Sequence, residues 1–199
     1  MNRLRLTRRG RTEKEQSSRR RRNRSRGAGL VEFALISPIF FAIIFGGIEM
    51  TLMFQSNLAI QDVSRSAARV ASIARDDANA DQLILQEIDA RSGTVNGDIA
   101  MVIIYAADTL DSPVPSQCFN ASGIAQTSPG NCNAYNAEWV DVAAGSAPVV
   151  TPGTGITDAQ RKQWQNIGIY IEYDYTFVTG FIDTTTLSAT TVEVIELDL

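Results

Sequence analysis

The sequence predicts an α+β protein in which a long N-terminal transmembrane helix continues into an extracytoplasmic helix, followed by a small antiparallel β-rich domain. Two observations lead to this prediction. A run of sixteen residues without a charged side chain spans Phe33 to Ile48. Later segments rich in β-branched and aromatic residues are separated by stretches rich in Ser, Pro, Gly and Asn.

The apolar run is long enough to cross a bilayer. As a helix, residues 30–54 extend for about 37 Å, whereas the hydrocarbon core of a bilayer is about 30 Å thick. Glu32 and Glu49 lie near the ends of this helix, where an ionisable side chain reaches the interface more easily than at the midplane. We therefore predict a transmembrane helix over residues 28–54.

The charged residues are distributed unevenly along the chain. Residues 1–26 hold twelve Lys or Arg and two Glu, whereas residues 27–199 hold six basic and twenty acidic residues. Because positive flanks stay in the cytoplasm, residues 1–27 are predicted to form a basic cytoplasmic leader, with the C-terminal part outside. The leader is too polar to bury a core, so we expect its first 26 residues to lack regular structure.

Two export signals fit this N-terminus less well than a membrane anchor does. The apolar run is slightly long for a secretory signal peptide, and no A-x-A cleavage site follows it. The pair Arg8-Arg9 lacks the rest of a twin-arginine signal and lies more than twenty residues before the apolar run.

A helical pattern continues beyond the predicted span. Apolar residues recur at spacings of three and four as far as about Arg75, and no Gly or Pro separates them from the membrane helix. A second helix is expected to begin at Asp76-Asp77 and to stop at Ser92-Gly93. Residues 55–91 are therefore predicted to form an extracytoplasmic helical segment.

The remaining residues, 92–199, are predicted to form the β-rich domain. Strands are expected at Ile99–Ala106, Ile167–Val178 and Leu187–Leu197. The insertion between the first two strands, residues 107–166, is too long for a structureless loop in a compact domain, so part of it should be ordered.

The residue types present exclude several kinds of chemistry. Without histidine, the chain has no Ser-His-Asp or Cys-His catalytic arrangement and no His-ligated metal site. Asp76, Asp77 and Asp81 lack EF-hand spacing and are interpreted as solvated acids or helix caps. No catalytic residue, metal, cofactor or small-molecule substrate is expected. The arginine run adjoins a membrane helix, which favours a role in topology over nucleic-acid binding.

The two cysteines, Cys118 and Cys132, lie in the long insertion. In an oxidising compartment, a disulfide between them would close a loop of about 15 residues and stabilise the domain by about 3 kcal/mol. There is no C-x-x-C spacing, so redox catalysis is not expected. Two free thiols are the alternative.

The junction between the leader and the apolar run carries the most specific pattern. Gly27 ends the basic segment, Ala28 begins the helix, and Glu32-Phe33 follow at the fifth and sixth positions after the glycine. This junction resembles the processing site of type IV pilin-like proteins, in particular the tight-adherence (Flp) branch. The resemblance implies cleavage between Gly27 and Ala28 by a prepilin peptidase. It also implies that Glu32 and Phe33 act in processing and assembly.

The resemblance to TadE-like pseudopilins covers about residues 26–75. It is carried by the segments Leu30-Val31-Glu32-Phe33-Ala34-Leu35, Pro38, Phe45-Gly46-Gly47-Ile48-Glu49, Ala68-Arg69 and Ala74-Arg75. A looser likeness, through Cys132-Asn133-x-Tyr135, reaches TadE-like proteins with a paired-cysteine loop. Phe33 replaces the Tyr of the major pilins in this branch, a change that pseudopilins accept.

Three features of the membrane helix have a structural and a functional interpretation. Pro38 is either a tolerated membrane proline or a flexible point used in packing. Gly46-Gly47 could permit close helix contact, although no GxxxG is present. Glu49 lacks an obvious partner among nearby cations and is expected to reach the outer interface, with pairing in an assembly as the alternative.

The resemblance implies a minor pilin or pseudopilin that acts in assembly of a tight-adherence pilus or secretion apparatus, and not an enzyme. The implied partners are the prepilin peptidase, other pilins or pseudopilins, the pilus assembly platform proteins and the membrane. The implied location is the cytoplasmic (inner) membrane, in a single pass, before entry into an extracellular pilus. The alternative is a signal-anchored extracytoplasmic binding or sensor protein that is neither processed nor assembled into a filament.

Overall fold

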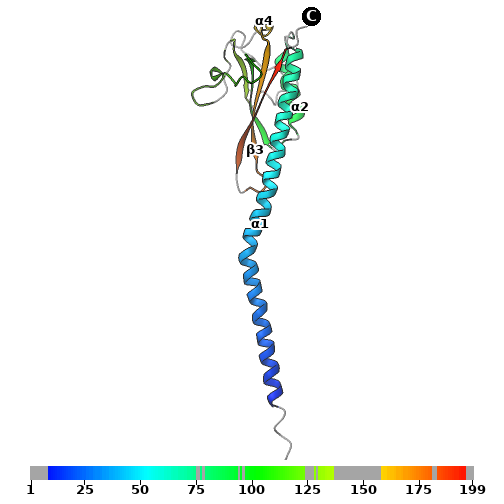
Figure 1. The fold of residues 1–199 in the computed structure, drawn as a ribbon, viewed down its shortest axis with the longest axis vertical. Helices are drawn as coiled ribbons and strands as arrows, with labels where there is room; N and C mark the ends of the chain where they lie inside the picture. The colour runs from blue at the N-terminus through cyan, green and yellow to red at the C-terminus, as the bar shows by residue number, and fades with distance from the viewer. Residues whose placement is uncertain are drawn as a thin grey trace, which may run out of the picture. The chain divides into compact units, whose positions relative to one another are not determined.

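The computed structural model describes residues 9–74, 77, 79–93, 95, 97–123, 128, 130–136, 158–180 and 183–195. The elements in chain order are α1 (Arg9–Ile73), α2 (Ala80–Ser92), β1 (Gly97–Ala107), η2 (Ser116–Cys118), β2 (Cys132–Asn136), α4 (Asp158–Arg161), β3 (Asn166–Thr176) and β4 (Thr184–Val194) (Figure 1). The predicted α+β class is confirmed. The chain divides within α1 into two compact units, Met1–Ile48 and Glu49–Leu199.

Helix α1 begins at Arg9, so the expectation that residues 9–26 lack regular structure is wrong. Arg, Lys, Glu and Gln lose little side-chain freedom in a helix, and no proline interrupts this segment. High charge therefore prevents burial in a core without preventing helix formation. The first eight residues of the predicted leader lie outside the described residues. Pro38 lies inside α1, which continues through it.

Within the second unit, α1 buries one face. Its buried side chains recur at helical spacing: Ile60, Val63, Ala67 and Ala71. Two of these are alanines, and Ala68 beside them is also buried, so the helix backbone can approach the sheet closely. The helix ends at Ile73, close to the end expected from the sequence.

Helix α2 begins at Ala80, whereas the sequence predicted that it would begin at Asp76-Asp77. Asp77 lies instead in the connection, where its Oδ1 accepts a hydrogen bond from the backbone N–H of Asn79 at 2.8 Å. The helix ends at Ser92, directly before Gly93, as the Ser-Gly pair predicts. Its buried apolar side chains, Ile84, Leu85 and Ile88, join the same core cluster as those of α1.

The strands form one antiparallel sheet in the order β2-β1-β3-β4. The three predicted strands correspond to β1, β3 and β4. Strand β2 has only five residues, and its sequence CNAYN contains two asparagines, so no strand was predicted there. Parts of the long insertion are ordered, as expected, since η2, β2 and α4 all lie within it.

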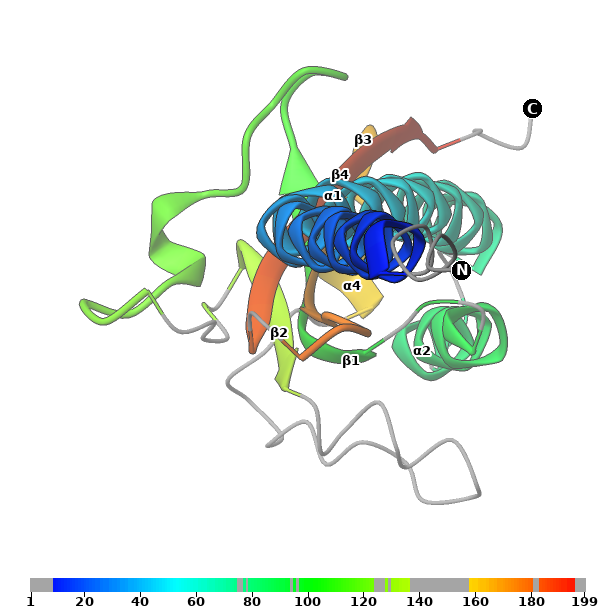
Figure 2. The ribbon, with the colours of Figure 1, turned by 90° about the horizontal axis from the view of Figure 1, so that it is seen from below.

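Strand β1 is buried on both faces, which explains its continuous apolar sequence. Val102 and Ile104 belong to the core cluster that includes α1 and α2. Ile103 and Tyr105 belong to a second cluster on the other face, together with both cysteines. Figure 2 shows α1 and α2 on one side of the sheet and the segment bearing η2 away from them.

Candidate processing and assembly site

The predicted processing junction lies within α1 and is exposed. Leu30 is 71% exposed and Phe33 is 67% exposed, and Gly27, Ala28 and Glu32 are exposed as well. A Cβ atom built on Gly27 would meet no other atom within 4 Å. The described chain therefore leaves the junction accessible, and its own packing does not require glycine at position 27.

The helix after the junction exposes large apolar side chains on all sides. Within the described residues, Gly27–Ile73 is the one helix long and apolar enough to cross a membrane. Each large apolar side chain left in water forgoes about 1.5–3 kcal/mol of burial free energy. Twelve such side chains are exposed here: Leu30, Val31, Phe33, Leu35, Ile36, Ile39, Phe40, Phe41, Ile43, Ile44, Phe45 and Ile48. The length and apolar composition of this helix therefore suit a membrane anchor.

The two glycines near the end of the apolar run stand in open space. A Cβ atom on Gly46 or Gly47 would meet nothing within 4 Å. Pro38 is also exposed. None of these three residues is needed for packing within the described chain, so each is accessible to lipid or to another helix.

Glu49 is 7% exposed and binds a segment far away in the sequence. Its Oε1 accepts a hydrogen bond from the backbone N–H of Thr179, just after β3. Its Oε2 accepts a hydrogen bond from the hydroxyl of Tyr175 at 3.5 Å. These partners are an amide and a phenol from a distant segment, so the absence of a nearby cation in the sequence does not leave the carboxylate without a partner. Glu49 is therefore paired within the chain.

Ser64 fixes α1 to the sheet, within two turns of the buried alanines that follow it. Its hydroxyl contacts the carbonyl oxygen of Ile169 at 3.3 Å and Oγ1 of Thr191 at 3.0 Å. Ser64 is fully buried, so both contacts are shielded from water. Glu49 and Ser64 together place polar attachment points at two levels of the same helix.

Comparison with known protein families gives a match within α1. A family model described as TadE-like protein matches residues 27–69. This part of α1 is therefore similar to TadE-like proteins. The match begins at Gly27 and includes both Glu49 and Ser64. No curated protein and no solved structure gives a significant match to the chain.

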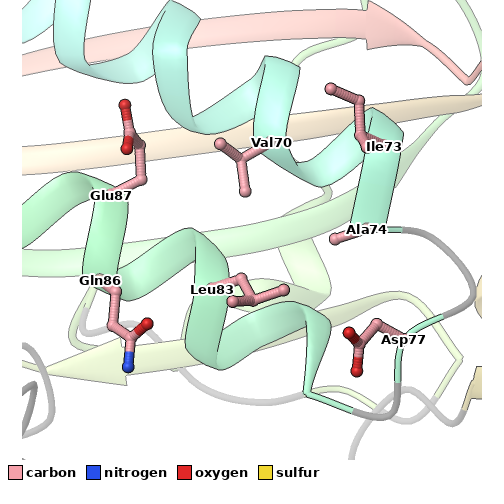
Figure 3. A pocket seen from close by; sticks show the side chains of 7 residues that line it. All are labelled: Val70, Ile73, Ala74, Asp77, Leu83, Gln86 and Glu87. Carbon is pink, nitrogen blue, oxygen red and sulfur yellow. The ribbon is translucent and has the colours of Figure 1, made fainter.

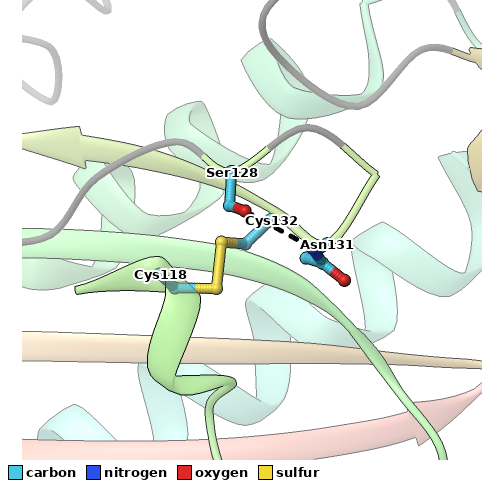
Figure 4. Close-up of a disulfide and its surroundings, with 4 residues drawn as sticks. All are labelled: Cys118, Ser128, Asn131 and Cys132. Atoms are coloured by element: carbon cyan, nitrogen blue, oxygen red, sulfur yellow. Dashed lines mark hydrogen bonds between the residues drawn. A yellow bond between two sulfur atoms is a disulfide. The ribbon is translucent and has the colours of Figure 1, made fainter. Parts of the chain in front are cut away.

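The disulfide expected between Cys118 and Cys132 is confirmed. It joins η2 to the first residue of β2, outside the TadE-like match, and both cysteines are fully buried (Figure 4). Next to it, the side-chain amide of Asn131 donates to Oγ of Ser128 at 3.4 Å. The hydroxyl of Tyr105 donates to the carbonyl oxygen of Ser112 at 3.0 Å. This hydrogen bond holds the loop between β1 and η2 to the face of the sheet that bears the disulfide.

A buried polar cluster around Asp81 was missed by sequence reasoning. Arg161 of α4 forms a salt bridge with the Asp81 carboxylate, and the amide of Asn133 donates to it at 2.6 Å. The hydroxyl of Tyr135 donates to the same oxygen at 2.5 Å. Burial, reinforced by the Asp81 carboxylate, raises the pKa of Tyr135. The interpretation of Asp81 as a solvated acid or cap is therefore wrong.

The sequence alone does not reveal this cluster, because the burial of Arg161 is visible only in the structure. Arg161 is one of only six basic residues after residue 26, and it is 3% exposed. A cation buried to that extent needs an anionic partner. The sequence still does not say which acid, because Asp81 is separated from Arg161 by 80 positions.

A shallow groove lies between the C-terminal end of α1 and α2. Its volume is about 550 Å³, and Figure 3 shows the side chains that line it. They are Val70, Ile73, Ala74, Asp77, Leu83, Gln86 and Glu87. Glu87 is already bound to the Ser66 hydroxyl at 2.5 Å and to Arg91. Within the described residues, no group of three or more His, Cys, Asp or Glu side chains could hold a metal ion.

Proposed function

We propose that this chain is a minor pilin or pseudopilin that acts in assembly of a tight-adherence (Flp-type) pilus or secretion apparatus. A prepilin peptidase matures it by cleavage between Gly27 and Ala28. One observation carries the proposal: the Gly27-x₄-Glu32-Phe33 pattern stands at the start of an exposed apolar helix that matches TadE-like proteins from residue 27 onward.

The leader holds the precursor at the membrane until cleavage. Each of its cations contributes about 1 kcal/mol when it lies near the anionic cytoplasmic leaflet. Hydrolysis of the Gly27–Ala28 peptide bond adds water, leaves a carboxylate on the discarded leader and a new α-amine on Ala28. The mature chain, Ala28–Leu199, keeps six basic and twenty acidic residues and loses the basic anchor.

The local sequence lowers the stability of the helix around the cleavage site. Proteases act on extended backbone, so α1 must unwind around the bond that is cut. Gly27 and Gly29 flank Ala28, and each glycine weakens a helix interior by about 1 kcal/mol relative to alanine. Since the chain itself leaves room for a side chain at position 27, the requirement for glycine is assigned to the peptidase.

Glu32 supplies the charge used in assembly. A carboxylate in the hydrocarbon region is costly unless it is paired. The α-amine created on Ala28 is the complementary cation, and the amine of a neighbouring subunit can bind Glu32 while the exposed apolar side chains pack together. Assembly therefore depends on cleavage, because only the mature chain carries that amine.

The proposed orientation places the leader in the cytoplasm and the domain outside. The basic leader supports it through the positive-inside rule. The Cys118–Cys132 disulfide supports it independently, because disulfides persist in oxidising compartments. The proposed partners are the prepilin peptidase, other pilins or pseudopilins and the assembly platform proteins of the inner membrane.

Intact-mass analysis of the membrane-extracted protein tests this proposal. In a strain with active prepilin peptidase, we expect a mature N-terminus at Ala28. Gly27→Phe should leave the full-length precursor, whereas Gly46→Ala, which also changes an exposed glycine of α1, should be processed normally. A wild-type protein that retains Met1–Gly27 and stays monomeric would instead indicate a signal-anchored binding or sensor protein.

A further inference from the structure

The end of the β3–β4 hairpin is attached to α1 at Glu49. The attachment consists of the hydrogen bonds from Thr179 and Tyr175 to the Glu49 carboxylate. Figure 1 shows this end of the hairpin beside the helix. Gly180 allows the chain to turn here, because its φ of +68° is strained for any residue with a side chain.

This attachment determines the level of the hairpin along the helix. Glu49 lies five residues before the end of the predicted span at Phe54, a rise of about 7.5 Å. The hairpin end is therefore level with the last turns of the span. A headgroup layer is about 5–8 Å thick on each side of the bilayer. Leu58 lies about 6 Å beyond Phe54, within that layer, and Asp62 lies about 12 Å beyond it.

The side chains at this level suit a lipid interface. Val178 at the hairpin end is 66% exposed, and Phe177 packs edge-on against Tyr175 with ring centroids 5.2 Å apart. On α1, Met50, Phe54 and Leu58 form an exposed stripe with one residue per turn, 61%, 62% and 57% exposed. The sequence has no charged residue from Met50 to Gln61 or from Tyr175 to Ile182.

We propose that the end of the β3–β4 hairpin, Phe177–Gly180, docks on the outer leaflet of the membrane. The stripe of Met50, Phe54 and Leu58 runs from the last turns of the span into the headgroup layer, and Glu49 acts as the latch between helix and hairpin. The occupant is the lipid surface, because the stripe continues the apolar helix that anchors the chain. The inference rests on the proposed membrane span and adds a second membrane contact to it.

Nitroxide accessibility measurements on the full chain test this inference. The two native cysteines are bonded to each other, so a label attaches to a single introduced cysteine. Val178→Cys is compared with Val194→Cys, which is also exposed, at 51%, but pairs with Asn166 at the other end of the sheet. Ten residues of strand separate the two levels by about 33 Å.

In vesicles of phosphatidylethanolamine and phosphatidylglycerol, collisions with oxygen report lipid and collisions with a soluble nickel chelate report water. We expect the oxygen-to-nickel ratio to be severalfold higher at position 178 than at position 194. Leu58→Cys should follow position 178, which provides a second reading if Val178→Cys does not fold. Glu49→Ala, which removes the latch, should lower the ratio at position 178 without changing it at position 194.

The outcomes separate this inference from the proposed span. An Ile43→Cys label in lipid, with positions 178 and 58 as accessible to nickel as position 194, would overturn the docking and leave the span intact. Protection of position 178 from both reagents would also overturn it, because protein would then cover the site. A water-exposed label at position 43 would remove the span and the docking together.

Discussion

The two parts of α1 show how one helix serves two environments. Residues 27–48 expose apolar side chains in every direction, and a Cβ atom added at any of the four glycines there meets nothing within 4 Å. From residue 49 onward, the helix buries one face of isoleucine, valine, serine and alanine against the sheet and α2. The difference is one of periodicity: an apolar sequence on all faces suits lipid, whereas an apolar stripe suits a protein core.

The largest expected difference concerns the two carboxylates Asp81 and Glu32. Asp81→Ala leaves Arg161 buried without its anionic partner and should lower the free energy of unfolding by about 3–5 kcal/mol. Replacing both partners, as Asp81→Leu with Arg161→Met, should recover most of that loss. Glu32→Ala should leave unfolding unchanged but impair maturation or assembly. Denaturant unfolding in detergent micelles, combined with intact-mass analysis, measures both effects.

A matched pair of isoleucines tests the comparison more directly. Ile60 is fully buried in the core, so Ile60→Ala should destabilise the outer domain by about 2–5 kcal/mol. Ile43→Ala, the same change on the exposed part of the same helix, should leave the unfolding midpoint of the domain unchanged. Equal midpoints for the two variants would show that the two parts of α1 do not differ in the way described.

Alanine substitutions at a glycine of the sheet and at a glycine of the exposed helix should give a smaller difference in domain stability. A Cβ atom on Gly168 of β3 would lie 2.2 Å from the ring of Tyr105, its neighbour on β1. Gly168→Ala should therefore cost about 1–3 kcal/mol through overpacking. Gly46→Ala should not lower domain stability. Tyr105→Ala combined with Gly168→Ala tests the mechanism, since removal of the ring should abolish the additional cost of the alanine.

The smallest expected effect is the loss of stability at acid pH that comes from Glu87. Hydrogen bonds from Ser66 and then Arg91 lower the pKa of Glu87 below its ordinary value of 4.5. Stability from this group is therefore present above pH 4.5 and is lost as pH falls through the lower folded-state pKa. We expect Glu87→Gln to remove under about 1 kcal/mol of this pH dependence. Asp89→Asn, an exposed change on the same helix, is the control.

Much of the fold follows from local patterns. The charge-free run from Phe33 to Ile48 predicts a membrane helix because, with the apolar residues on either side of it, it is long enough to cross a bilayer. β1 is recognisable as a buried strand from its continuous apolar sequence. Composition misled the prediction at two places. The high charge of residues 9–26 suggested that they form no helix, and the short polar sequence of β2 gave no sign of a strand.

The sequence by itself determined the α+β class and the long apolar helix, and it offered a disulfide between Cys118 and Cys132 that the structure confirmed. The proposed processing junction at Gly27-Ala28 also comes from the sequence, because its spacing is local. Only the tertiary structure decided which distant groups meet Glu49 and Asp81. The partners of those carboxylates are two amides, two tyrosine hydroxyls and one arginine, brought together by sheet register and helix packing. Such contacts have no sequence period, because they depend on the three-dimensional path of the whole chain.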